Sequence, residues 1–165
     1  KVVYDIGANN GVVAYMASMA GCKSVHALDH DEECIQNMKQ ANNHLGIRNV
    51  LPVKYNFGET TTNKADITVA MAIIHWVYSC TAHFGSLERI VGYLKSMTRE
   101  HLIVEWVAPD DCAIRSFNHL SFNEMLDKEP YTLEKFEQAI ATHGGRVVDR
   151  LPTDKCTRTT YVVQF

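Results

Sequence analysis

The sequence predicts a three-layer α/β domain in which helices cover both faces of a doubly wound, mostly parallel sheet of seven strands. Short apolar, β-rich runs alternate with segments of helical period almost to the end of the chain. Such alternation is typical of right-handed βαβ units, which bury a parallel sheet between two layers of helices. The last two β-rich runs are separated only by a polar turn, so we expect them to form an antiparallel hairpin.

Seven segments have the composition expected of strands, because they are rich in apolar and β-branched residues and are bounded by turn-forming residues. They are residues 1–6, 24–29, 49–55, 66–72, 101–107, 146–151 and 159–165. The first of them closes on a glycine-rich turn. This order predicts five parallel strands followed by one hairpin.

The predicted helices carry their own start and stop signals. Asp31, Ser86 and Thr132 are N-cap residues that directly precede residues of helical period. Glycines at 21, 46 and 144–145 are expected to end the helices that begin at 12, 31 and 132, because glycine readily adopts the left-handed conformation at a helix end. Residues 58–63 are predicted to form a polar loop, and residues 109–127 are expected to be irregular or helical.

Length, charge and composition restrict the kind of protein. The chain has 165 residues, a formal net charge of −3 and 46% hydrophobic residues, which suits one domain with a sizeable core. No stretch approaches the ~20 apolar residues of a membrane span, and the start does not resemble a signal peptide. We therefore expect a soluble, cytoplasmic protein with no membrane partner. The scattered Lys and Arg residues do not favour nucleic acid as a partner.

The start of the chain and its cysteines carry two further expectations. The sequence begins at Lys1, inside a predicted strand, so residues 1–165 are expected to be a single domain cut from a longer chain, with that chain's other domains as partners. Five cysteines contain no C-x-x-C pair, which favours reduced thiols over a disulfide framework or a zinc site.

The turn after the first strand carries the most informative motif, Asp5-Ile6-Gly7-Ala8-Asn9-Asn10-Gly11. In a doubly wound sheet, ligands bind beyond the carboxyl ends of the strands, where glycines let the backbone approach them. The spacing G-x-x-x-G differs from the G-x-G-x-x-G of dinucleotide-binding turns. An acid two residues before the first glycine would repel a pyrophosphate and attract an ammonium group, so Asp5 favours a cofactor that carries an amino acid.

These residues resemble motif I of class I S-adenosylmethionine (SAM)-dependent methyltransferases, D/E-x-G-x-G-x-G, with Ala8-Asn9 where glycine is commoner. Asp29 ends the second strand, about 20 residues beyond the glycines, where an acid binds ribose hydroxyls. The alternative for Asp29 is a plain helix-entry residue. The resemblance implies that His30 lies along the adenine, that Asn56 meets its amino group, and that the backbone after the fourth strand contacts the methionine moiety. The predicted cofactor-binding residues are Asp5, Gly7, Ala8, Asn9, Asn10, Gly11, Asp29, His30, Asn56, Phe57, Ala70 and Met71.

On the acceptor side, His75 resembles the histidine that follows the fourth strand in many small-molecule methyltransferases. It is our candidate general base, because an imidazole titrates near neutral pH. The alternative is a core histidine bonded to backbone. Glu105 is a weaker catalytic candidate, and Asp110 is a candidate acceptor of hydrogen bonds from substrate hydroxyls. Trp76 and Trp106 are expected at the carboxyl edge of the sheet, where a substrate sugar or planar ring could stack on them, although packing explains Trp76 equally well.

Two further segments resemble a subgroup of these enzymes, namely residues 104–111 and Tyr131-Thr132 with Phe136, so the resemblance covers essentially the whole chain. It implies methyl transfer from SAM, with S-adenosylhomocysteine (SAH) as the product. The Trp and carboxylate residues at the predicted pocket edge and the missing basic patch favour a hydroxyl of a small molecule or glycan as the acceptor, with a sugar hydroxyl preferred. Some sugar and catechol methyltransferases use Mg²⁺, and Asp110 with Asp111 could join such a site. This alternative is not favoured, and no metal ligands are predicted.

Three alternatives stay open. An N-methyltransferase that acts on a small-molecule amine would need no strong base. An NAD-type oxidoreductase would share the fold, although the charge of Asp5 and the glycine spacing speak against it. The third is a non-catalytic domain that keeps the fold and binds SAM, a nucleotide or another partner, and the intact Asp5, Gly7, Gly11 and Asp29 argue against loss of the cofactor site.

Overall fold

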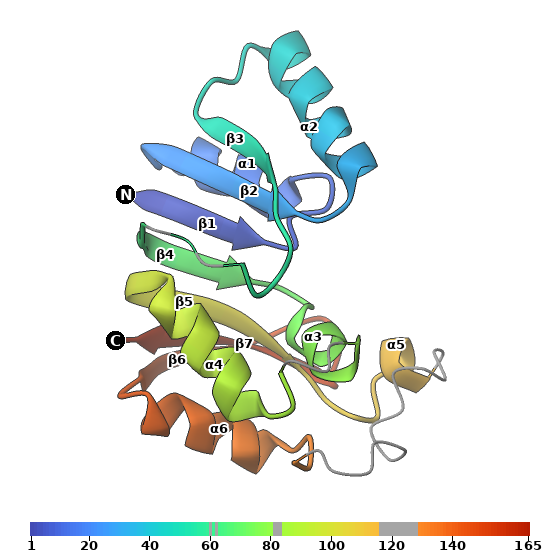
Figure 1. The fold of residues 1–165 in the computed structure, drawn as a ribbon, viewed down its shortest axis with the longest axis vertical. Helices are drawn as coiled ribbons and strands as arrows, with labels where there is room; N and C mark the ends of the chain where they lie inside the picture. Colours follow the sequence, from blue (N-terminus) through green and yellow to red (C-terminus); the bar gives the residue numbers. More distant parts are fainter. Residues whose placement is uncertain (60, 62, 81–83, 116–128) are drawn as a thin grey trace.

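The computed structural model describes the whole chain except residues 60, 62, 81–83 and 116–128. Seven strands form one sheet in the spatial order β3-β2-β1-β4-β5-β7-β6 (Figure 1). The strands are β1 (Val2–Ile6), β2 (Ser24–Asp29), β3 (Val50–Lys54), β4 (Ala65–Ala70), β5 (Thr98–Val107), β6 (Arg146–Pro152) and β7 (Arg158–Gln164). The helices are α1 (Val12–Met19), α2 (Glu32–Leu45), α3 (Ile74–Cys80), α4 (Leu87–Ser96), α5 (Cys112–Arg115) and α6 (Leu133–Thr142).

The pairing of the strands confirms the predicted fold class. β1 pairs in parallel with β2 and β4, β2 with β3, and β4 with β5, whereas β7 is antiparallel to both β5 and β6. The chain builds outward from β1 to β3 and then returns to place β4 on the other side of β1. The order therefore reverses between β1 and β4, and this switch point is where doubly wound sheets bind ligands.

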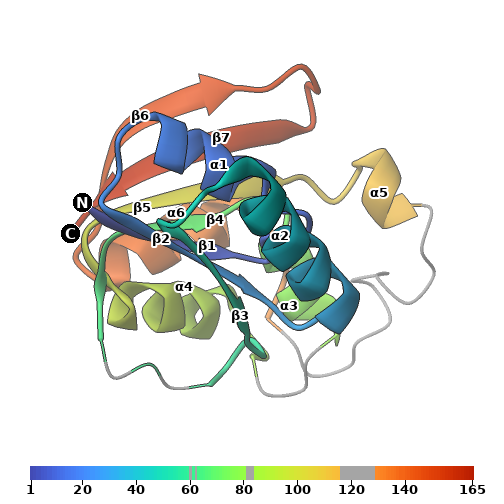
Figure 2. The same cartoon turned by 90° about the horizontal axis from the view of Figure 1, so that it is seen from above.

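Two hydrophobic cores lie on opposite faces of the sheet, because successive side chains of a strand point to opposite faces. Val3 packs with residues of α1 and α2 in the smaller core. Tyr4 and Ile6 pack with residues of α3, α4 and α6 in the larger one. Figure 2 shows α1 on one side of the sheet and α4 on the other. This alternation places Asp5 on the same face as Val3, toward α1.

The predicted helix signals are found where expected. Each of the three N-cap side chains accepts a hydrogen bond from a backbone N–H, at 2.8 Å for Asp31 and at 3.2 Å for Ser86 and Thr132. Gly46 ends α2 with a φ of 67°. Helix α1 differs, since its N-cap is Gly11, which has no side chain to satisfy the first N–H groups of the helix.

Two strand boundaries differ from the prediction by more than one residue. β4 ends at Ala70 because Ala72 adopts a φ of 51°, which is incompatible with a strand. β5 begins earlier than expected, at Thr98, whose Oγ1 donates to Oγ1 of Thr68 at 2.8 Å in the interior. Of the segment expected to be irregular or helical, α5 is a short helix and residues 116–127 lie outside the described residues. Within the described part of the chain, no helix has the length and apolar character needed to cross a membrane.

Candidate functional site

A cleft with a volume of about 680 Å³ opens at the carboxyl ends of β1 and β2, beside the switch point. Residues that follow β3 and β4, together with part of α3, complete its walls. The volume lies in the range of roughly 300–1,000 Å³ that is typical of small-molecule sites. The predicted site residues that line the cleft are Gly7, Asn9, Asp29, His30, Asn56, Phe57, Met71 and Trp76.

The turn after β1 meets the cleft through Gly7, whose φ of 71° is a conformation that glycine adopts without strain. The N–H groups of Gly7 and Ala8 both donate to the carbonyl oxygen of Leu28, at 2.8 and 3.1 Å, and tie the turn to β2. A Cβ at Gly7 would lie 2.8 Å from Cδ1 of Ile73, another cleft-lining residue. Any side chain at this position would therefore displace the opposite wall.

The other residues of the turn shape it without lining the cleft. Ala8 is buried in the core beneath α1 and α2, and Asn10 is exposed. Gly11 donates its N–H to the carbonyl of Ala8 at 2.8 Å and so closes the turn. A Cβ at Gly11 would lie 2.8 Å from Sδ of Met38, so this glycine lets α1 begin close against α2. Ala8, Asn10 and Gly11 are not among the described lining residues of the cleft, and their predicted contact with the cofactor stays a prediction.

Asp29 is a buried carboxylate held in a defined orientation at the end of β2. Its Oδ2 accepts from the backbone N–H of Asn9 at 2.7 Å, and its Oδ1 accepts from the N–H of Asp31 at 2.9 Å. Nδ1 of His30 lies 3.3 Å from the same Oδ1. A carboxylate can accept about four hydrogen bonds. Asp29 therefore retains capacity to accept from hydroxyl groups of a ligand in the cleft that it lines.

Asp5 lies beneath the turn and is not among the described residues that line the cleft, so its predicted contact with the cofactor stays a prediction. Its side chain is 2% exposed and faces α1, where a backbone hydrogen bond from Ala14 stabilises the carboxylate. This bond serves the start of a helix whose cap residue is glycine. Burial raises the pKa of Asp5 to about 6, and the nearby charge of Asp29 acts in the same direction. Among the described residues, its Oδ2 atom has no hydrogen-bond partner.

The charges around the cleft are of one sign. Asp29 and Asp31 line it, and the described lining residues include neither Lys nor Arg. Asp5, one layer below, adds a third carboxyl group close to Asp29. A pyrophosphate needs cationic side chains or free backbone N–H groups. The carboxylates therefore favour a ligand that carries positive charge.

The loop after β4 forms the wall that faces Gly7. Met71, Ala72 and Ile73 line the cleft, while Ala70 is fully buried behind them and does not reach it. The φ of Ala72 is 51°, and the left-handed conformation costs a residue other than glycine about 1–2 kcal/mol. Neighbouring contacts must offset this strain for the loop to keep its shape.

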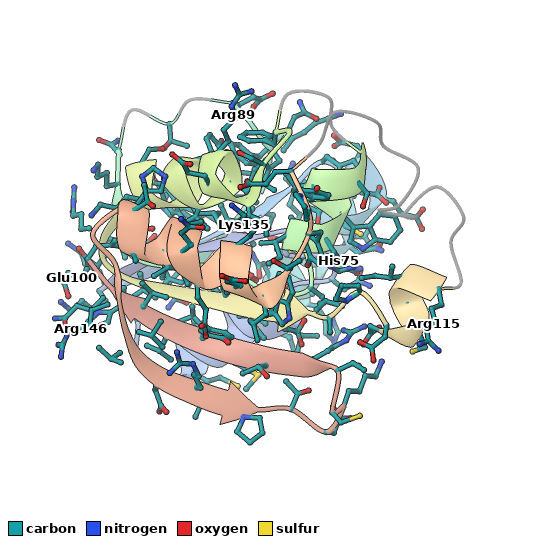
Figure 3. The ribbon with its side chains drawn as sticks, turned by 90° about the horizontal axis from the view of Figure 1, so that it is seen from below. His75, Arg89, Glu100, Arg115, Lys135 and Arg146 are labelled. Carbon is teal, nitrogen blue, oxygen red and sulfur yellow. The ribbon has the colours of Figure 1, made fainter. Side chains whose placement is uncertain are left out.

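The two predicted residues of α3 face in different directions. Trp76, 36% exposed, lines the cleft. His75, 1% exposed, points into the molecule, and Figure 3 shows it between α3 and the sheet while Arg89, Arg115 and Arg146 lie at the rim. Burial lowers the pKa of His75 to about 4, and the charge of Arg158 contributes. Its Nδ1 has no hydrogen-bond partner among the described residues. The alternative of a core histidine bonded to backbone therefore does not hold for Nδ1.

Two predicted substrate residues do not gather with the others. Trp106 is 4% exposed and packs in the larger core, with its ring stacked on Tyr131 and Phe136 at centroid distances of 4.5 and 5.3 Å. It belongs to the hydrophobic core and offers no open face to a substrate, because alternation along β5 directs it away from the face that carries Glu105. Asp110 is exposed and does not line the cleft.

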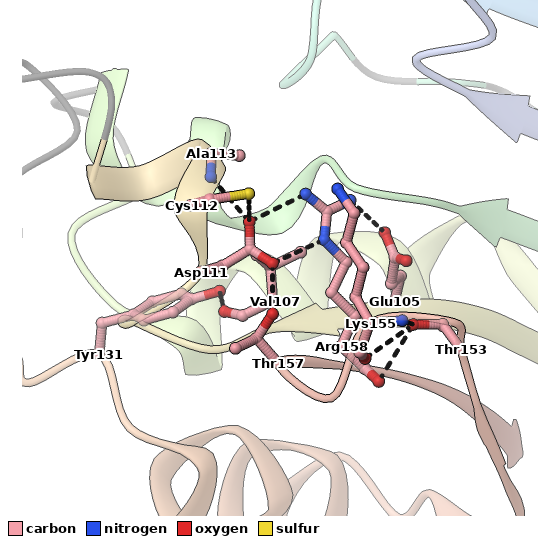
Figure 4. A network of polar contacts seen from close by, with 10 residues as sticks. All are labelled: Glu105, Val107, Asp111, Cys112, Ala113, Tyr131, Thr153, Lys155, Thr157 and Arg158. Atoms are coloured by element: carbon pink, nitrogen blue, oxygen red, sulfur yellow. Dashed lines mark hydrogen bonds and ion pairs between the residues drawn. The ribbon is translucent and has the colours of Figure 1, made fainter.

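A buried polar network next to Glu105 was not predicted (Figure 4). Asp111 is fully buried and accepts from Nε and Nη2 of Arg158 at 2.9 and 3.0 Å and from Oγ1 of Thr157 at 2.6 Å. The Arg158 hydrogen bonds hold the pKa of Asp111 far below its usual value. Nη1 of Arg158 lies 3.7 Å from Oε2 of Glu105. The only sequence signal for this network is the acidic pair at residues 110–111. No sequence motif connects that pair to Arg158, which lies 47 residues after Asp111.

Glu105 is buried at the same edge and contacts the loop after β4. Burial raises the pKa of its carboxyl, while Arg158 and a backbone hydrogen bond from Ala72 act against that rise. Glu105 does not line the cleft. Among the described residues, no three His, Cys, Asp or Glu side chains are grouped so that they could hold a metal ion.

Comparison with solved structures identifies the fold as that of class I SAM-dependent methyltransferases. Magnesium protoporphyrin IX methyltransferase (ChlM) from Synechocystis PCC 6803 with bound SAH matches with a TM-score of 0.73 and 14% identity, over 98% of this chain and 72% of that one. A SAM-dependent methyltransferase from Aquifex aeolicus matches with a TM-score of 0.66 and 19% identity, over 99% and 81%. WbdD matches with a TM-score of 0.72 and 13% identity, over 99% of this chain and 35% of its own. No family model matches the sequence.

Proposed function

We propose that the cleft binds SAM and that the chain transfers its methyl group to a hydroxyl of a small molecule or glycan, with a sugar hydroxyl as the preferred acceptor. The observation that carries the cofactor half of this proposal is the charge of the cleft, since Asp29 and Asp31 line it and its described lining residues include neither Lys nor Arg. SAM combines a nucleoside with a sulfonium and an ammonium group, so it suits such a lining. The fold supports the proposal, since ChlM of the same fold binds SAH.

Different residues of the cleft would contact different parts of the cofactor. Asp29, held by two backbone N–H groups, would accept from the ribose hydroxyls. His30, Asn56 and Phe57 would contact the adenine. Gly7 and the loop 71–73 would enclose the methionine part. The unpartnered Oδ2 of Asp5 lies beneath this end of the cleft and would attract the ammonium group through the turn.

Methyl transfer requires alignment and removal of one proton. The bound cofactor supplies an electrophilic methyl group on a positively charged sulfur. The acceptor oxygen would form a bond to the methyl carbon as the carbon–sulfur bond breaks, and the electron pair of that bond would stay on sulfur. The hydroxyl proton would go to a base, for which the sequence's candidate is His75. Its imidazole is neutral at pH 7 and its Nδ1 bonds no described residue, but its side chain is buried and does not line the cleft, so this role requires the acceptor to reach it beside α3.

One observation favours a second acceptor class. A pKa of about 4 makes His75 a weak proton acceptor at neutral pH, and an amine attacks as its free base without needing a strong one. N-methylation of a small-molecule amine is therefore the second candidate. The identity of the acceptor decides between the two.

Calorimetry tests the cofactor half of the proposal. SAM and SAH should bind with dissociation constants in the micromolar range, at about −8 kcal/mol, and NAD should not bind. Asp29→Ala should weaken SAH binding, whereas Asp154→Asn, in the exposed turn between β6 and β7, should leave it unchanged. Binding of NAD with no binding of SAM at millimolar concentration would reject the proposal, and binding of neither would favour the non-catalytic alternative.

Mass spectrometry tests the acceptor half. Incubation with SAM and panels of sugars, glycans and small amines should yield a product heavier by one CH₂ group from a hydroxyl compound. With that acceptor, His75→Ala should slow O-methylation by about 100-fold or more if His75 removes the proton. A loss of only a few-fold would exclude His75 as the base. A product formed only from amines would establish the second candidate.

A further inference from the structure

The network of Asp111, Arg158 and Glu105 does not line the cleft, but Glu105 contacts Ala72, which does. Asp111 follows β5, Arg158 begins β7, and Glu105 lies near the end of β5. Arg158 pairs with Val107 across the antiparallel ladder, which places its side chain diagonally opposite Glu105 on the same face. The network therefore connects the C-terminal hairpin to the edge where the cleft opens.

Asp111 fixes the guanidinium of Arg158. The two hydrogen bonds from Nε and Nη2 are bidentate, at 2.9 and 3.0 Å, and the N–H of Ala113 and Oγ1 of Thr157 also donate to the carboxylate, at 2.8 and 2.6 Å. A guanidinium held by such a fork has one defined orientation. Its remaining group, Nη1, is directed to Oε2 of Glu105 at 3.7 Å.

Glu105 links the oriented guanidinium of Arg158 to the loop after β4. Ala70 and Val104 are partners in the parallel ladder, so the residues after each of them leave the sheet side by side. The backbone of Ala72 hydrogen bonds to the carboxylate of Glu105. Ala72 is the residue of this loop with a left-handed φ, and it lines the cleft together with Ile73, which packs against Gly7.

We propose that Arg158 is a positioning residue, which acts through Glu105 to hold Ala72 in its left-handed conformation and so sets the wall of the cleft. Its effect on SAM binding rests on the proposed function, whereas its effect on the loop does not. A purely structural ion pair between the hairpin and the segment after β5 would stabilise the fold and leave the loop unaffected.

Arg158→Lys tests the proposal because lysine keeps the charge and loses the bidentate fork to Asp111. Hydrogen exchange of residues 71–77, read by mass spectrometry without ligand, should accelerate several-fold, because the Ala72 N–H loses its fixed acceptor. The dissociation constant for SAH should rise by about 5- to 10-fold, within the range reported for coupled sites. Arg150→Lys is the matched control, since Arg150 lies in the same hairpin and pairs with Glu137 at the surface, at 3.1 Å.

Ala72→Gly separates positioning from stability, because glycine adopts a positive φ without strain. In the Ala72→Gly background, Arg158→Lys should change SAH binding by no more than about twofold, because the two substitutions act through one contact and their effects do not add. The loss of stability in urea should be the same in both backgrounds. Glu105→Ala, which leaves Asp111 and Arg158 paired and removes the acceptor of the Ala72 hydrogen bond, serves if Arg158→Lys does not fold, and should give the same acceleration in residues 71–77.

The outcomes separate the two proposals. Unchanged hydrogen exchange in residues 71–77 of a destabilised Arg158→Lys variant would overturn the positioning role. A wild-type protein that binds no SAH would reject the proposed function, and the exchange measurement would still decide the role of Arg158. An equal loss of SAH binding in both Ala72 backgrounds would also contradict the route through Ala72.

Discussion

Replacing Asp5 by Asn is expected to stabilise the protein at neutral pH. Asp5 is 2% exposed, and its burial raises the pKa of the carboxyl from 3.8 to about 6. Each pH unit between these values corresponds to about 1.36 kcal/mol, so the difference of about 2.2 corresponds to a penalty of about 3 kcal/mol once the carboxyl is ionised in both states. Asparagine has nearly the same shape, can accept the hydrogen bond from Ala14 and carries no charge.

The direction in which Asp5 changes stability with pH follows from its pKa values in the unfolded and the folded chain. Below pH 3.8, Asp5 is protonated in the folded and the unfolded chain, and it contributes no difference. Between pH 3.8 and 6, the unfolded chain loses the proton while the folded chain keeps it, so stability falls as the pH rises. Above pH 6 the penalty is complete. The gain from Asp5→Asn should therefore be about 3 kcal/mol at pH 7.5 and about half of that at pH 5.

Urea unfolding at pH 5.0 and 7.5 measures this gain. With slopes of about 1–3 kcal/mol per molar urea, the midpoint should move up by at least about 1 M at pH 7.5. Asp154→Asn, at an exposed carboxyl of the β6–β7 turn, should move it little at either pH. A gain that does not depend on pH, or a loss of stability at pH 7.5, would refute the reasoning. The same Asp5→Asn variant should bind SAH more weakly, since it removes negative charge beneath the turn.

Three further predictions concern the cleft and His75. Gly7→Ala should lower the free energy of unfolding by about 1–2 kcal/mol because of the positive φ at this position, and it should also weaken SAH binding by displacing Ile73. Gly46→Ala is the control: Gly46 has a φ of 67° and open space around it, so this variant should lose stability without losing SAH binding. Asp29→Asn should reduce SAH affinity about tenfold or more in calorimetry, because a charged acceptor of ligand and backbone N–H groups is lost, and unchanged affinity would contradict its ribose role. The pKa of His75 is lowered from 6.5 to about 4, so the unfolded chain binds a proton first on acidification. The free energy of unfolding should therefore fall by about 3 kcal/mol between pH 6.5 and 4. His75→Gln should flatten this dependence of stability on pH in urea titrations, and an unchanged dependence would show that other groups cause it.

The sequence by itself determined the order of elements and the position of the cleft. Alternating strand and helix periods predict a doubly wound sheet, and caps such as Asp31 and Ser86 set helix boundaries through contacts two or three residues away. Gly7 and Asp29 could be placed at the cleft because the carboxyl ends of neighbouring parallel strands meet at one edge. These signals are local or depend on topology alone.

The tertiary structure decided which side chains reach the cleft. Asp5 lies beneath the turn, and Trp106 lies in the core. The side of a strand or loop that a side chain occupies depends on how the elements pack, and no local motif encodes this packing. The pairing of Asp111 with Arg158 joins residues 47 positions apart across an antiparallel ladder. Such contacts arise only when the hairpin docks on β5, since the burial that makes them necessary does not exist in the unfolded chain.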